Sequence, residues 1–207
     1  VYAGDYPHMK DCLESKLFGI GLESYTVGSH DFYLSYCLKN NKIITLDTGH
    51  FHLTESIADK VSSLLLFLPG LMLHVSRPVR WDSDHVVTLS DELCDLMREL
   101  VRCRALDRVY VGLDYFDATI NRIGAYVSGS RAVQKALLLA LLEAKGQLTA
   151  LEDNNRLFER LAWQEEAKAM PWGAVYDYFC LTQNVPVGKQ YIEMVGAYEK
   201  EVLSRRG

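Results

Sequence analysis

Aspartate, glutamate and histidine side chains recur in this chain where short apolar segments end. The candidates are Glu23, Asp47, His50, His74, Asp82, Asp84 and Asp114. Carboxylate oxygens and imidazole nitrogens are protein groups that bind divalent cations. A single acid after a strand is usually a helix cap or a solvated loop residue, but its repetition at successive strand ends indicates a shared metal site.

The elements that carry these side chains alternate between strands and helices. We expect continuous apolar strands at residues 17–23, 42–46, 71–75 and 108–113. Amphipathic helices are predicted at 29–40, 54–67 and 90–104, with Ser29, Thr54 and Ser90 as N-caps. This order predicts an α/β fold whose parallel sheet is covered on both faces. From residue 121 onward only helices are predicted, at 130–142, 156–169, 172–181 and 189–205.

Strand ends converge at one mouth in a parallel β/α barrel. The four predicted strand ends carry Glu23, Asp47, His74 and Asp114, and together these side chains would hold one divalent cation. The carboxylates of Asp82 and Asp84 point to the same side of an extended backbone. With His50, which follows Asp47 by three residues, they would form a second site beside the first. His52 competes with His50, because alternate residues of an extended segment share a side; a peripheral role is predicted for His52.

The composition excludes several kinds of partner. A net charge of −5 and a pI of about 5.7 give no basic surface for nucleic acid. The longest apolar runs, 64–68 and 136–142, are too short to cross a membrane. The five cysteines are scattered and odd in number, so we expect reduced thiols in a cytoplasmic protein rather than a disulfide framework.

Three kinds of function fit these residues. Two cations beside a sugar-sized pocket polarise a carbonyl and ionise a hydroxyl, which suits aldose–ketose isomerisation. They also suit a barrel hydrolase that uses a metal-bound hydroxide. In the third reading the chain is a non-catalytic assembly subunit with vestigial ligands.

Four stretches of the sequence carry a resemblance to a known family: KLFGIG at 16–21, LDTGHFH at 46–52, HVSRPVRWDSDH at 74–85 and GLDYFD at 112–117. They closely resemble L-rhamnose isomerase, and the resemblance runs from about residue 13 to the end of the chain. It implies a xylose-isomerase-like (β/α)8 TIM barrel with a helical extension that builds a homotetramer. Residues 1–128 would then be the second half of the barrel, strands 5–8, and residues 129–207 would be the extension.

The resemblance also implies roles for the candidate ligands. It makes Glu23, Asp47, His74 and Asp114 ligands of a structural zinc or manganese ion. It makes His50, Asp82 and Asp84 ligands of a catalytic manganese ion, and it assigns Asp84 and Asp114 to catalysis. The implied reaction converts L-rhamnose, or a related aldose, to L-rhamnulose by a hydride shift or an enediol route. Xylose isomerases carry a lysine two residues after the equivalent of Glu23, where this chain has Tyr25, so no such electrophile is expected.

The match covers only the second half of the family's chain. Strands 1–4 of the barrel are absent, and half a barrel leaves open strand edges and an uncovered apolar face. We therefore expect a separate polypeptide that supplies strands 1–4, or a longer enzyme of which this chain, which starts at Val1, is a piece. The chain alone is expected to have little or no isomerase activity.

Overall fold

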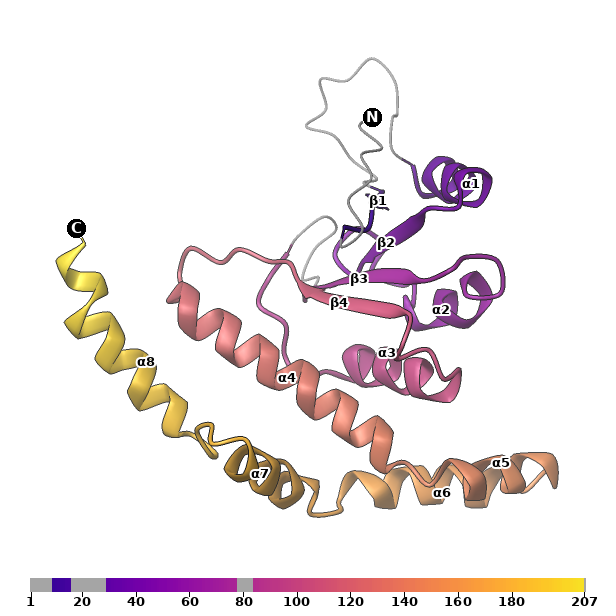
Figure 1. Ribbon diagram of the computed structural model, residues 1–207. Helices are drawn as coiled ribbons and strands as arrows, with labels where there is room; N and C mark the ends of the chain where they lie inside the picture. The colour runs from indigo at the N-terminus through magenta and orange to yellow at the C-terminus, as the bar shows by residue number, and fades with distance from the viewer. Residues whose placement is uncertain (1–8, 16–28, 78–83, 207) are drawn as a thin grey trace. The chain divides into compact units, whose positions relative to one another are not determined.

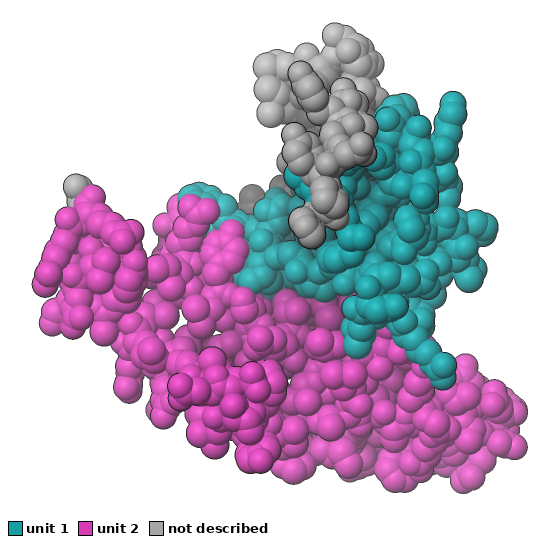
Figure 2. Space-filling view, in the orientation of Figure 1, with its two compact units in different colours: residues 1–87, 103–117 teal, residues 88–102, 118–207 magenta. Residues whose placement is uncertain are grey.

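The computed structural model describes residues 9–15, 29–77 and 84–206 (Figure 1). These residues fall into two compact units (Figure 2). Unit 1 comprises residues 1–87 and 103–117, and unit 2 comprises residues 88–102 and 118–207. Unit 1 contains the sheet and unit 2 contains most of the helices.

A four-stranded parallel sheet forms unit 1, with its strands adjacent in chain order. The strands are β1 (Cys12–Glu14), β2 (Ile43–Asp47), β3 (Leu71–Val75) and β4 (Val109–Leu113). The predicted parallel α/β sheet is therefore confirmed, and three of its strands lie within one residue of their predicted bounds. The strand predicted at 17–23 lies outside the described residues, and the sequence did not predict β1.

The register of the sheet places the candidate ligands on one face and buried aliphatic side chains on the other. Asp47 pairs with His74, and His74 pairs with Gly112, so these residues lie in one row across the sheet. Paired residues point to the same side of a pleated sheet, and their neighbours along each strand point to the other side. The opposite side of β2 and β3 carries fully buried aliphatic side chains: Ile44, Leu46, Leu71, Leu73 and Val75.

The sequence predicted that both faces of the sheet are covered, and this prediction is wrong for β4. All five residues of β2 are buried, whereas Tyr110 and Val111 of β4 are 40% and 41% exposed. The physical reason is position, because β4 is the last strand of the described sheet and pairs only with β3. An edge strand with exposed apolar residues is open to pairing with a further chain segment.

Two helices of unit 1 connect its strands. Helix α1 (His30–Asn40) begins where predicted, because Ser29 Oγ accepts a hydrogen bond from Phe32 N at 3.3 Å, and it packs against β1 and β2. Helix α2 (Ala58–Leu64) is shorter than predicted. Thr54 is not its cap, because the Thr54 hydroxyl lies 2.7 Å from His52 Nδ1 instead.

The remaining helices form unit 2. Their bounds are α3 (Asp91–Arg102), α4 (Arg122–Leu142), α5 (Lys145–Asp153), α6 (Leu157–Lys168), α7 (Trp172–Thr182) and α8 (Gln190–Glu201), followed by a 3-10 turn at Leu203–Arg205. Helix α4 begins earlier than predicted, because Asn121 Oδ1 caps it by accepting from Gly124 N at 2.9 Å. Helix α5 was not predicted. Helix α3 packs along α4, and its Arg102 donates twice to the Glu143 carboxylate, at 3.0 and 2.7 Å.

Two sequence expectations concern the chain as a whole. None of the described helices is long and apolar enough to cross a membrane. All five cysteines lie in the described part of the chain, and none of them forms a disulfide there.

Candidate metal centre

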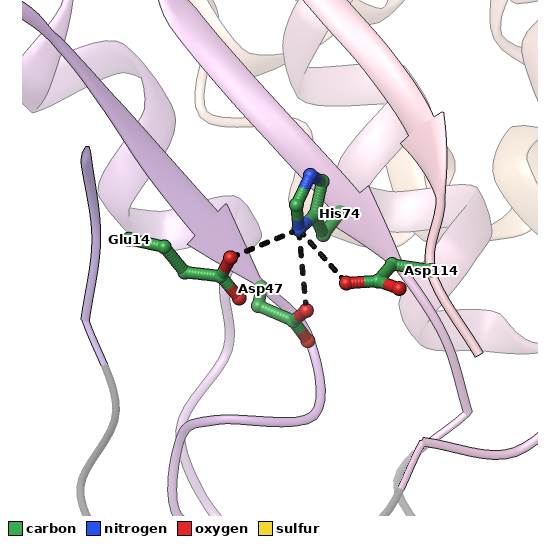
Figure 3. A group of neighbouring side chains, drawn as sticks. All are labelled: Glu14, Asp47, His74 and Asp114. Carbon is green, nitrogen blue, oxygen red and sulfur yellow. Dashed lines mark ion pairs between the residues drawn. The ribbon is translucent and has the colours of Figure 1, made fainter. Parts of the chain in front are cut away.

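Four acidic and histidine side chains meet at the carboxyl ends of the strands (Figure 3). Glu14 ends β1, Asp47 ends β2, His74 is next to last in β3, and Asp114 follows β4. His74 Nδ1 lies at the centre of the group, 3.3 Å from Glu14 Oε2, 3.6 Å from Asp47 Oδ2 and 3.1 Å from Asp114 Oδ2. We call these four residues the first group.

The geometry of the first group fits a bound cation. One imidazole nitrogen carries a single proton or lone pair, so it cannot satisfy three carboxylates. His74 Nδ1 and Asp47 Oδ2 are buried, and neither forms an aligned hydrogen bond within the described part of the chain. One donor atom from each residue lies within 4.8 Å of all the others. A cation with ligands at about 2.0–2.2 Å needs donors about 3–4 Å apart, which small side-chain movements supply.

A second group shares Asp47 with the first and adds His50 and Asp84. His50 Nε2 lies 3.9 Å from both Asp47 Oδ2 and Asp84 Oδ2. The other ring nitrogen, Nδ1, lies 3.0 Å from the Ser15 carbonyl oxygen. A proton on Nδ1 would donate to that carbonyl and present Nε2 as the ligand atom, which is the usual arrangement around metal-binding histidines.

Charge and burial shift the pKa values of these side chains. The His50 and His74 rings, whose Nδ1 atoms lie 3.0 and 3.3 Å from the Glu14 carboxylate, hold the pKa of Glu14 well below its usual range. Contacts with Asp47 and Glu14 raise the pKa of His74 to about 10. Burial lowers the pKa of His50, but the Glu14 and Asp47 carboxylates outweigh it and raise that pKa to about 9. Burial raises the pKa of Asp47, whose side chain is almost fully enclosed. The histidines thus hold protons that a bound cation would replace.

The row beside His74 ends in a glycine for a steric reason. A Cβ on Gly112 would lie 2.9 Å from Met72 Cε and 3.4 Å from His74 Cδ2. The missing side chain therefore leaves room chiefly for the end of the Met72 side chain, with the His74 ring at contact distance.

Comparison with known proteins decides the family. A family model described as L-rhamnose isomerase (RhaA) matches residues 4–206 of the chain. The chain belongs to the L-rhamnose isomerase family.

Several curated members of the L-rhamnose isomerase family are close in sequence. The L-rhamnose isomerase of Bacteroides thetaiotaomicron is 63% identical over 206 residues, which is 100% of this chain and 49% of that protein. The L-rhamnose isomerase of Citrobacter koseri is 55% identical over 199 residues, 96% of this chain and 48% of its own length. The L-rhamnose isomerase of Escherichia coli K12 is 54% identical over 200 residues, 97% of this chain and 48% of its own length. The chain thus spans about half the length of the curated L-rhamnose isomerases that it matches.

The structure brings together most of the residues that the sequence singled out. Asp47, His74 and Asp114 lie in the first group, and His50 and Asp84 lie in the second. The His52 ring lies in neither group and contacts Thr54. The remaining candidates, Glu23 and Asp82, lie outside the described residues.

Glu14 is the candidate ligand that the sequence prediction missed. It stands in the first group where Glu23 was expected. Its strand has only three residues, so the longer apolar run at 17–23 gave the stronger strand signal. The spacing rule of the related isomerases could have found it. Lys16 follows Glu14 by two residues, whereas Tyr25 follows Glu23. Lys16 itself lies outside the described residues.

Proposed function

We propose that this chain supplies the metal-binding half of an L-rhamnose isomerase that interconverts L-rhamnose, or a related aldose, and L-rhamnulose. The first group carries the proposal, because in a chain of this family it joins four candidate cation ligands at the ends of four adjacent strands. Carboxylate and imidazole ligands suit manganese and zinc. We propose manganese at the second group, with Asp82 as a further ligand, and zinc or manganese at the first.

Each side chain has a defined task in this proposal. Divalent cations bound here would polarise the sugar carbonyl and the neighbouring hydroxyl. Asp47 and His74, which lie in β2 and β3, would hold the first cation. Asp84 and Asp114 lie at the outer edge of the two groups, with side chains 31% and 55% exposed, and we propose that they face the sugar and act in catalysis.

We further propose that β1–β4 are strands 5–8 of a (β/α)8 barrel. The parallel order, the exposed residues of β4 and the half-length match to the relatives support this arrangement. A segment or second chain would then supply strands 1–4. The functional division is proposed at 1–128 for the half-barrel and 129–207 for the helical extension, which differs from the two packing units because α3 belongs to unit 2.

The helical extension is proposed to assemble the enzyme, as a homotetramer. Large apolar side chains on its last helices are exposed, among them Phe158, Leu181 and Met194. Exposed apolar patches of this kind mark protein–protein contacts. A cytoplasmic location stays a prediction from the free cysteines.

The experiment is an isomerase assay combined with metal analysis. The chain would be purified from its native source, under conditions that keep partners bound, and assayed for L-rhamnulose formation with Mn²⁺. We expect strands 1–4 in a co-purifying polypeptide or in the same, longer polypeptide, together with stoichiometric divalent cation and turnover. The 207-residue chain alone should show little or no turnover.

Two other results would replace the proposal. A complex without stoichiometric cation would favour the non-catalytic assembly subunit. Metal-dependent hydrolysis without rhamnose isomerisation would favour the barrel hydrolase, which the family match does not.

A further inference from the structure

The segments that follow β2 and β3 are hydrogen-bonded to each other before they reach His50 and Asp84 of the second group. After β2 the chain turns through Thr48 and Gly49 to His50, and after β3 it continues through Ser76 toward Asp84. The main chain of this turn is held by hydrogen bonds from Thr48 N to His74 O at 3.0 Å and from His50 N to Asp47 O at 3.2 Å.

The Thr48 hydroxyl forms hydrogen bonds with both the N–H and the carbonyl group of Ser76. We call this pair of hydrogen bonds the clasp. Thr48 Oγ1 accepts from Ser76 N at 2.8 Å and donates to Ser76 O at 2.9 Å. Ser76 is buried, so its peptide groups have little access to water as an alternative partner. The hydroxyl therefore fixes where the chain leaves β3.

The Ser76 side chain connects the clasp to the Asp84 carboxylate. Ser76 Oγ lies 3.3 Å from Thr48 Oγ1 and 3.5 Å from Asp84 Oδ1. Asp84 Oδ1 also occupies the space that a Cβ on Gly49 would need. On the other side, the Asp84 carbonyl oxygen accepts from Phe116 N at 3.3 Å. Asp84 thus contacts the same turn that carries His50.

We propose that Thr48 is a positioning residue for the second group, acting through Ser76 to set the distance between His50 and Asp84. This inference rests on the proposed function, because it takes the second group as a cation site. Thr48 is not a ligand in this proposal. Its hydroxyl places two ligands that come from different strand ends, and substitutions of such supporting groups typically lower metal affinity about 10- to 100-fold.

The test measures Co²⁺ binding by its visible d–d absorption, which depends on coordination and needs no turnover. Asp114→Asn and Asp84→Asn assign the two binding steps to the first and second groups. Thr48→Val removes the hydroxyl at nearly constant shape and keeps the main-chain bond to His74, while Thr48→Ser keeps the hydroxyl. Thr182→Val is the matched control, since it removes a threonine hydroxyl bonded to Phe179 O in α7.

We expect Thr48→Val to weaken the second step about 10- to 100-fold and to change its spectrum. The first step should stay within about twofold, because Thr48→Val keeps the bond from Thr48 N to His74 O, and the hydroxyl that it removes is bonded to Ser76, outside the first group. Thr48→Ser should restore the second step, and Thr182→Val should leave both unchanged.

The inference is overturned if wild type binds two Co²⁺ ions and Thr48→Val leaves the second step intact, or if Thr48→Ser weakens it as much as Thr48→Val. Should Thr48→Val fail to fold by circular dichroism, Thr48→Ala decides instead, because it removes the same hydroxyl and the same two bonds to the Ser76 main chain; an unweakened second step refutes the clasp. Absence of Co²⁺ binding by wild type refutes the proposed metal centre itself, and the clasp with it.

Discussion

Removing the His74 ring should abolish the stabilisation that a cation gives to the first group. Three carboxylate oxygens approach His74 Nδ1 within 3.1–3.6 Å, so His74→Ala deletes the donor that all of them share. A ligand at 100 times its dissociation constant stabilises the folded state by about 2.7 kcal/mol per site. For a chain of this size, each kcal/mol shifts Tm by about 2–4 °C, so one filled site raises Tm by about 5–11 °C.

The assay is thermal unfolding with chelator and with Mn²⁺, followed by circular dichroism. Wild type should show the full shift, His74→Ala should lose the first-group contribution, and Asp47→Asn should lose both contributions because Asp47 belongs to both groups. His52→Ala is the matched control, since its ring lies outside both groups, and it should keep the wild-type shift. A His74→Ala protein that gains as much as wild type from Mn²⁺ would refute the assignment of the first group.

Three further predictions concern other parts of the chain. Gly112→Ala should lower the free energy of unfolding by about 1 kcal/mol, the lower end for overpacking, because the flexible end of Met72 can move away; denaturant unfolding measures this. Arg131→Met should cost about 3 kcal/mol by the same measurement, because buried Arg131 donates to Pro186 O and Gly188 O, and exposed Arg205→Met should cost almost nothing. Burial raises the pKa of Cys37 to about 11, so the folded chain holds less thiolate than the unfolded chain; mass spectrometry should show slower alkylation of Cys37 at pH 8 before denaturation than after it.

The sequence predicted the middle of the sheet well because a short, continuous apolar run is typical of a buried strand in a parallel sheet. Residues 71–75 form the predicted strand without change, and the predicted ligand His74 follows from its place at the strand end. The helices were less predictable. Helix α2 begins four residues after Thr54, because the Thr54 hydroxyl binds His52 rather than the helix, and a local sequence pattern cannot rank two such partners.

The periodicity of the sequence could not identify Glu14 as a strand residue, for a different reason. A three-residue strand has too little pattern of its own, and β1 exists because Cys12, Leu13 and Glu14 pair with Ile43, Ile44 and Thr45 of β2. Such pairing depends on tertiary structure, which overrides local propensity. The position of the carboxylate is therefore a property of the assembled sheet, although the spacing to Lys16 was visible in the sequence.

Asp47 belongs to both groups, and its surroundings favour a positive charge beside its carboxylate. Its side chain is 1% exposed, and Gly49 N donates to Oδ1 at 2.7 Å, which turns Oδ2 toward His74 and His50. Burial penalises its charged form and raises its pKa, while Glu14 adds a further negative charge nearby. A buried carboxylate in this setting is costly unless it is paired or coordinates a metal. A cation at either group lowers that cost through Asp47, so we infer that filling one site changes the affinity of the other.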